Sequence, residues 1–141
     1  MKRLKIALEG PINGCSDSEC QDWRKKVIDE LGKWYDFHNP MDLDCRGREQ
    51  DAEQELVDYD TAGIASSDIV LAMAEKPTWG TAMGIQMAWA MHKMVMTVCL
   101  SDKPSPWLKN RTTHMFRNLE DVIRFLKSLA EAREKMSGEC N

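Results

Sequence analysis

A carboxylate on the apolar side of a predicted helix is the first candidate for chemistry in this 141-residue chain. The helix before the apolar run DIVLAMA carries Leu56, Asp60 and Ile64 at i, i+4 and i+8, which places all three on one face. An inward carboxylate costs free energy unless it is paired, and burial is a common way to tune a pKa for catalysis. Asp60 is therefore either a catalytic group or a group that caps or bridges to a loop.

A glycine inside another predicted helix is the second unusual feature. In PTWGTAMGIQMAWAM (77–91) a turn closes at Gly80 and a helix follows, with Gly84 inside it. Glycine there costs roughly 1 kcal/mol relative to alanine, so local folding does not favour Gly84. The hydroxyls of Thr78 and Thr81 beside free N–H groups suit an anion such as a phosphate or carboxylate. An ordinary threonine N-cap is the simpler explanation for them.

A loop with two glycines follows the first apolar run. The run LKIAL (4–8) predicts a buried strand that ends in the sequence EGPING (9–14). Its glycines would let the backbone approach a ligand closely. The spacing differs from G-x-G-x-x-G, so a dinucleotide site is not expected. The loop is either a ligand loop or a plain tight turn.

Strands and helices alternate along the chain, and this alternation predicts the fold. The predicted strands cover 4–8, 35–38, 68–74 and 94–100. The predicted helices run from the capping box at 16–19 to Leu31, from the polar loop 41–49 to about Ser66, from about Gly80, and from Asn118. Such a pattern is typical of a parallel sheet covered on both faces. We expect an α/β fold, a flavodoxin- or Rossmann-like three-layer sandwich with a parallel five-stranded sheet.

The length fits one domain over 1–141. Ligands of parallel α/β sheets bind beyond the carboxyl ends of the strands. Three segments are therefore expected to meet in one cleft: 9–14, the loop after Pro40, and 75–81.

Composition narrows the class of partner. The net charge is −4 and no basic stripe is visible, so a nucleic acid polymer is not an expected partner. No segment resembles a membrane span or a signal peptide. The five cysteines lack C-x-x-C spacing, which favours a reducing, cytoplasmic setting with free thiols. The three histidines are scattered, so neither a metal site nor a cofactor is expected. The methionines between 73 and 96 are expected to fill the core or a helix–helix dimer seam.

Four stretches together resemble the nucleoside 2-deoxyribosyltransferase-like family. They are IALEGPING…DWR, NPMDLDCRGRE, DYDTAGIASSDIVLAMAEKPTWGTAMGI and SPWL…H, and they follow in this order over nearly the whole chain. The resemblance implies the flavodoxin-like fold. It also implies action on the N-glycosidic bond of a (deoxy)nucleoside or nucleoside 5′-monophosphate, by deoxyribosyl transfer between bases or by hydrolysis.

The resemblance also implies roles for single residues. Asp60 matches the active-site aspartate that assists the leaving base. Thr78 stands where transferases commonly have an aspartate and monophosphate hydrolases tend to have a hydroxyl. The segment 105–114 resembles one that completes a neighbouring subunit's site, which implies a homodimer or higher homo-oligomer. The expected substrate contacts are Gly10, Pro11, Ile12, Asn13, Arg46, Gly47, Thr78, Gly80, Thr81 and His114.

One departure from the family pattern G-[ST]-x-x-E bears on the unusual glycine. That glutamate is the nucleophile that attacks C1′ to give a covalent glycosyl-enzyme, and Gly84 stands in its place. Either the carboxylate is lost and activity is impaired, or it has moved to Glu9, where relatives usually carry a small residue. Loss is the favoured hypothesis because an angle of attack is hard to reproduce from another strand. A glutamate at position 84 is expected to fit the helix without harm.

Two other functions remain open at this point. The chain is alternatively a catalytically silent protein that binds or sequesters a nucleotide-like ligand, with Gly84 making room for it. An unrelated flavodoxin-like interaction module is the third alternative, and it would leave the inward position of Asp60 unexplained.

Overall fold

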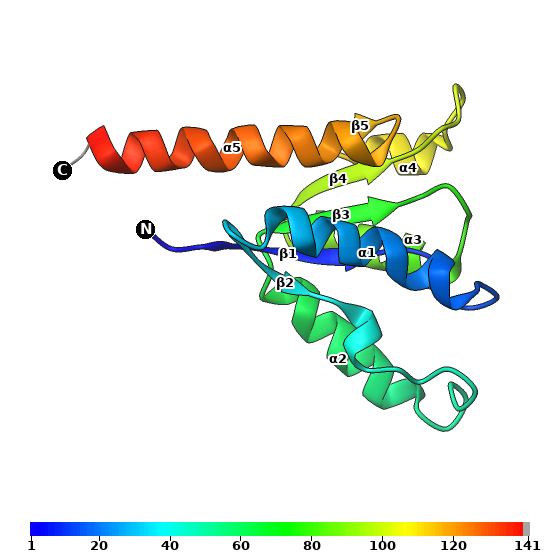
Figure 1. Ribbon diagram of the computed structural model, residues 1–141. Helices are drawn as coiled ribbons and strands as arrows, with labels where there is room; N and C mark the ends of the chain where they lie inside the picture. Colours follow the sequence, from blue (N-terminus) through cyan, green and yellow to red (C-terminus); the bar gives the residue numbers. More distant parts are fainter. Residues whose placement is uncertain (140–141) are drawn as a thin grey trace.

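The computed structural model describes residues 1–139 and confirms the expected α/β fold (Figure 1). Five parallel strands form one sheet in the order β2-β1-β3-β4-β5. The strands are β1 (Leu4–Glu9), β2 (Tyr35–His38), β3 (Ile69–Met73), β4 (Met94–Val98) and β5 (His114–Phe116). In Figure 1 the strands run toward the same side of the molecule, so their carboxyl ends meet at one edge.

Helices cover both faces of the sheet. The main helices are α1 (Asp17–Leu31), α2 (Glu53–Ala65), α3 (Trp79–Ala90) and α5 (Leu119–Glu139), with the short helices η1 (Pro40–Asp42) and α4 (Pro106–Asn110) between them. The alternation of β1 shows the two layers: Ile6 and Leu8 pack in the core beneath α1 and α5, and Ala7 packs beneath α2 and α3. Glu9 follows Ala7 at a spacing of two, which turns it toward the α2–α3 layer.

The predicted N-terminal caps of α1 and α5 are confirmed. The sequence did not predict the positions of β5 and α4. Ser16 and Glu19 form the capping box of α1, and Asn118 accepts a hydrogen bond from the Asp121 N–H (2.8 Å). The fifth strand was expected without a position because a three-residue edge strand carries too little periodicity. The helix α4 lies between β4 and β5, where the sequence predicted no helix.

The methionines divide between the core and the surface. Met96 is buried in the core, whereas Met83 and Met91 are exposed, so the part of the expectation that concerns a helix–helix dimer seam stays a prediction. Four cysteines, Cys15, Cys20, Cys45 and Cys99, are free as expected, and Cys140 lies outside the described residues.

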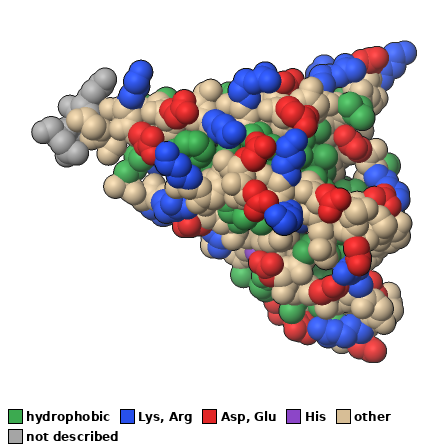
Figure 2. Space-filling model, in the orientation of Figure 1, with side chains coloured by type: hydrophobic (Ala, Val, Ile, Leu, Met, Phe, Trp, Pro, Cys, Tyr) green, Lys and Arg blue, Asp and Glu red, His purple; other side chains and the backbone are tan. Residues whose placement is uncertain are grey.

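Within 1–139 no helix combines the length and the apolar character needed to cross a bilayer. On the face shown in Figure 2, basic and acidic side chains are interspersed.

A buried arginine ties α1 to the end of β1. The side chain of Arg24 is almost fully buried. Its guanidinium donates to the carbonyl oxygen of Gly10 (3.1 Å) and, at longer range, to that of Leu8 (3.4 Å). The third donor group binds the carbonyl of Cys20 within α1. Arg24 therefore holds the loop after β1 in place.

Replacing Arg24 by leucine is expected to lower the free energy of unfolding by about 1–3 kcal/mol, because the buried Gly10 carbonyl loses its partner. Urea unfolding of Arg24→Leu beside the parent measures this. The exposed neighbour Lys25 supplies the control, since Lys25→Met should change stability by no more than about 0.5 kcal/mol. Equal effects at both positions would contradict a holding role for Arg24.

Candidate active site

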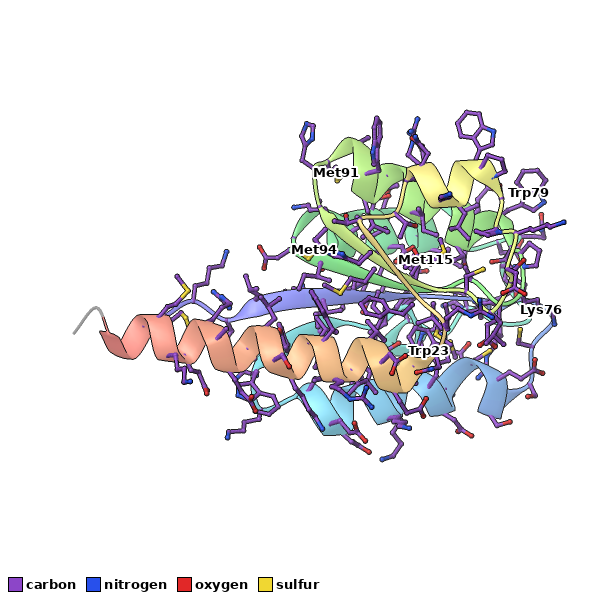
Figure 3. The ribbon with its side chains drawn as sticks, turned by 90° about the horizontal axis from the view of Figure 1, so that it is seen from above. Trp23, Lys76, Trp79, Met91, Met94 and Met115 are labelled. Carbon is purple, nitrogen blue, oxygen red and sulfur yellow. The ribbon has the colours of Figure 1, made fainter. Side chains whose placement is uncertain are left out.

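A cavity of about 350 Å³ opens at the carboxyl ends of β1, β2 and β3. The three segments predicted to converge there all contribute to its wall. Nine of the predicted site residues line it: Glu9, Gly10, Ile12, Asn13, Arg46, Asp60, Thr78, Gly80 and Thr81. Figure 3 places the labelled Trp79 and Lys76 at this end of the molecule, away from Met91 and Met94. The size suits a small organic ligand.

The remaining four predicted residues do not line this cavity. Pro11 lines a second depression beside Trp23. Gly47 is exposed on the loop after β2, with a φ of +83° that favours glycine. His114 lies on the far edge strand, where its ring packs against Phe125. Gly84 is buried behind the cavity wall. The contribution of the segment 105–114 to a neighbouring subunit stays a prediction.

Two carboxyl groups meet at the inner wall of the cavity. Glu9 ends β1 and is only 4% exposed, and Asp60 reaches it from α2 with a side chain that is 25% exposed. Burial raises the pKa of Glu9 well above its ordinary value of 4.5. The negative charge of Asp60 and a hydrogen bond between the two groups raise this pKa further, and the Arg24 guanidinium lowers it. Carboxyls this close do not readily ionise together, so the pair favours one shared proton.

A histidine joins the carboxyl pair, although the sequence suggested that the histidines are scattered. His38 ends β2 beside Ala7 of β1, and its Nε2 lies 2.9 Å from Asp60 Oδ1. One donor atom each from Glu9, His38 and Asp60 lies within 4.8 Å of the others. This spacing could hold a divalent cation. However, the 2.9 Å contact is a hydrogen bond in its own right, so a proton already links these two groups.

Gly84 faces the carboxyl group of Glu9. A Cβ atom built on Gly84 would lie 3.2 Å from Glu9 Oε2 and 3.5 Å from Ile64 Cδ1. The Glu9 carboxyl thus fills the space that a side chain at position 84 would enter. A side chain at position 84 would require the Glu9 carboxyl to shift by a few tenths of an ångström, so the expectation that a glutamate fits there without harm stays a prediction.

The rest of the wall combines an apolar surface with paired polar groups. Leu56 does not join the core as its helical face suggested, because that face of α2 borders the cavity and leaves Leu56 38% exposed. Tyr59, which the sequence did not single out, lies beside it and packs against the His38 ring with a centroid separation of 5.1 Å. An aromatic and apolar wall of this kind suits a flat ring such as a nucleobase.

Arg46 and the threonines complete the rim. Arg46 is held by Asp44 (2.7 Å) and by Asp17, and its guanidinium lowers the pKa of Asp44 to about 2. Thr78 is the N-cap residue of α3, but its hydroxyl donates to the Thr81 hydroxyl (2.8 Å) instead of accepting from the backbone. The N-terminal N–H groups of α3 therefore face the cavity without a side-chain cap.

Comparison with known proteins gave matches only among solved structures, since no family model and no curated protein matches the chain. A 2-deoxyribosyltransferase from Bacillus psychrosaccharolyticus superposes with a TM-score of 0.68 at 17% identity, covering 84% of this chain and 90% of that one. The CMP N-glycosidase of Clostridium botulinum gives 0.64 at 13% identity, covering 89% and 98%. A conserved protein from Enterococcus faecalis gives 0.68 at 17% identity, covering 90% and 99%. The chain therefore has the fold of 2-deoxyribosyltransferases and of a nucleotide N-glycosidase.

Proposed function

We propose that this chain acts on the N-glycosidic bond of a (deoxy)nucleoside or nucleoside 5′-monophosphate, as a member of the nucleoside 2-deoxyribosyltransferase-like family. The observation that carries the proposal is the carboxyl pair of a buried Glu9 and a partly buried Asp60 at the wall of a nucleoside-sized cavity. The shared fold supports it, because structures with this fold include a 2-deoxyribosyltransferase and a CMP N-glycosidase.

A carboxyl pair that holds one proton has the two protonation states that a retaining glycosidic reaction requires. Such a reaction needs one ionised carboxylate as nucleophile and one protonated carboxyl as acid, on the order of 5 Å apart. One carboxyl oxygen of Glu9 and one of Asp60 lie no more than 4.8 Å apart, so the two groups are at this separation or closer. One shared proton, passed from Glu9 to Asp60, supplies both states at once.

The reaction then proceeds in two displacements. The Glu9 carboxylate forms a bond to C1′ while the N-glycosidic bond breaks, and its electron pair leaves with the base, which takes the proton of Asp60. In the second displacement water or another base attacks C1′ and gives a proton to the Asp60 carboxylate, and the bond to Glu9 breaks. The covalent intermediate divides one difficult displacement into two easier ones.

The contact between Glu9 and Gly84 supports relocation of the nucleophile over its loss. The sequence alone favours loss of the nucleophile, because another strand seldom reproduces its angle of attack. In the structure the Glu9 carboxyl lies 3.2 Å from the place where a side chain at position 84 would begin. We therefore propose that Glu9 supplies the carboxylate from β1, and that the small residue at position 84 gives it space.

The rim of the cavity suits the rest of a nucleotide. The uncapped N-terminus of α3, with the hydroxyl of Thr81, offers donors to a sugar or phosphate oxygen. The hydroxyl at Thr78 agrees with the monophosphate hydrolases of the resemblance, so we propose hydrolysis of a 5′-monophosphate as the first reaction to assay.

Glutamine at position 9 is expected to slow base release by at least about a hundredfold, which corresponds to roughly 2.7 kcal/mol in the barrier. The assay measures free base from a panel of deoxynucleosides and their 5′-monophosphates. Gly84→Glu alone should also slow the reaction, because a third carboxylate crowds the pair. The double variant Glu9→Ser, Gly84→Glu should regain at least tenfold over Glu9→Gln, since it restores the family arrangement.

The exposed carboxylate variant Glu53→Gln is the control and should match the parent. Full activity of Glu9→Gln would contradict relocation. An inactive parent with an active double variant would instead show that the carboxylate was lost. Binding without turnover in every variant would identify a silent nucleotide-binding protein.

The stability of the parent is expected to fall as pH rises above the ordinary glutamate pKa of 4.5. The folded state keeps a proton on Glu9 that the unfolded chain releases, so the folded state binds more protons and its stability declines with pH until the raised pKa is passed. Glu9→Gln should therefore gain stability relative to the parent across this window, by about 1.4 kcal/mol per unit of pKa shift. Urea unfolding at several pH values measures the difference, with Glu53→Gln as the control. A difference that is flat with pH, or that reverses, would contradict a raised pKa.

We also propose a homo-oligomer, because large apolar side chains are exposed on α3, on α4 and in the segment between β4 and α4. Trp79 is 83% exposed and Trp107 is 73% exposed, with Met83 and Leu100 also largely exposed. Sedimentation at micromolar concentration should show a dimer or larger assembly, and Met83→Asp should shift it toward monomer, whereas Lys25→Met should not. A parent that sediments only as monomer would contradict the assembly.

A further inference from the structure

We propose that His38 is a positioning residue that determines which carboxyl of the Glu9–Asp60 pair is ionised. In the free protein it holds Asp60 as the carboxylate and leaves the shared proton on Glu9. The catalytic consequence rests on the proposed function, but the assignment of the proton can be tested without any substrate.

The first observation is the hydrogen bond between the imidazole and Asp60. His38 Nε2 lies 2.9 Å from Asp60 Oδ1, and the proposal places the proton of this contact on Nε2, from which the ring donates to an ionised carboxylate. The imidazole is buried, with a side chain only 5% exposed, which strengthens a hydrogen bond to a charged group. This donor stabilises the ionised form of Asp60 more than the protonated form. The Glu9 carboxyl has no comparable donor, since its Oε1 is buried without a hydrogen-bond partner among the described residues.

The second observation is that the chain makes room for the imidazole. A Cβ atom on Gly63 would lie 2.2 Å from His38 Nδ1 and Cε1, which is far too close for any side chain. Gly63 is inside α2, where glycine costs roughly 1 kcal/mol relative to alanine. On the other side the Tyr59 ring packs against the imidazole. Two residues of α2 thus form a slot that fits the ring and aims Nε2 at Asp60.

The groups around the pair favour ionisation of different carboxyls. Arg24 on α1 favours the ionised form of Glu9, while His38 on β2 favours the ionised form of Asp60. The other titratable groups nearby are Tyr59 on α2, whose pKa is raised mainly by burial, and Asp42, whose charge raises the same pKa. Without His38, Arg24 would be the one cationic side chain in this set, and because it favours the ionised form of Glu9 the shared proton would move from Glu9 to Asp60.

This assignment has a role in the proposed reaction. Asp60 becomes ionised each time it gives its proton to the leaving base. The donor on His38 stabilises that carboxylate, and it prepares Asp60 to take a proton from the attacking water or base. His38 touches Asp60 and not the substrate, since it does not line the cavity.

The test is a pH titration of the carboxyl carbons by ¹³C NMR, on protein labelled at the Glu and Asp side-chain carboxyls and without substrate. Glu9→Gln and Asp60→Asn identify the two signals. In the parent, Asp60 should account for most of the lower titration step of the pair and Glu9 for most of the upper one. In His38→Phe both steps should move to higher pH, the lower one by about one unit or more, and Asp60 should take the larger share of the upper step.

His38→Gln keeps an N–H donor and should retain the parent order, a rescue that mere filling of the slot would not predict. His92→Gln changes an exposed histidine and should leave both signals unchanged. A His38→Phe protein whose two signals titrate as in the parent would overturn the inference, as would a parent in which Asp60 already holds the proton. If His38→Phe fails to fold, the order in the parent and its retention in His38→Gln still decide the matter. Failure of the N-glycosidase assay would leave the titration result unchanged, so the two proposals fail separately.

Discussion

Burial of two carboxyl groups side by side is the constraint around which this site is arranged. Moving an ionised carboxylate out of water is costly, and a second negative charge a few ångströms away adds to that cost. Glu9 meets both conditions at the end of β1. A pair that keeps one proton avoids the second charge, and it retains one group able to donate and one able to attack. The proposed chemistry follows from this single proton.

Several features far apart in the sequence support the pair by giving space or charge. Gly84 leaves room for the Glu9 carboxyl and Gly63 leaves room for the His38 ring. Both glycines stand inside helices, where local folding would favour almost any other residue. Arg24 fixes the loop after β1 and places a positive charge near Glu9. These residues lie on three helices, so the parallel sheet is what brings them to one edge.

The sequence predicted the parts of this arrangement that depend on periodicity. Apolar runs gave β2 at its observed bounds and β1, β3 and β4 within a few residues, and their alternation with helices indicated the parallel sheet. The spacing of Asp60 indicated an inward carboxylate, and the sheet rule indicated where the loops meet. His38 was missed because nothing local in the sequence ties it to Asp60. The rule that parallel strands end at one edge could have paired it with Glu9, since both residues end strands. The need for glycine at position 63 depends on a ring from another element, which no local pattern contains.

The most direct test of the account is to trap the glycosyl-enzyme. A 2′-fluoro-2′-deoxynucleoside or its 5′-monophosphate carries an electron-withdrawing fluorine beside C1′, which slows both displacements through an oxocarbenium-like transition state, and a reactive leaving base restores the first. Intact-protein mass spectrometry would detect the adduct, and peptide mapping would locate it. The account predicts one fluorosugar per chain, attached to Glu9. An adduct on Asp60, or release of the base with no adduct on Glu9 under conditions that trap a retaining enzyme, would contradict it.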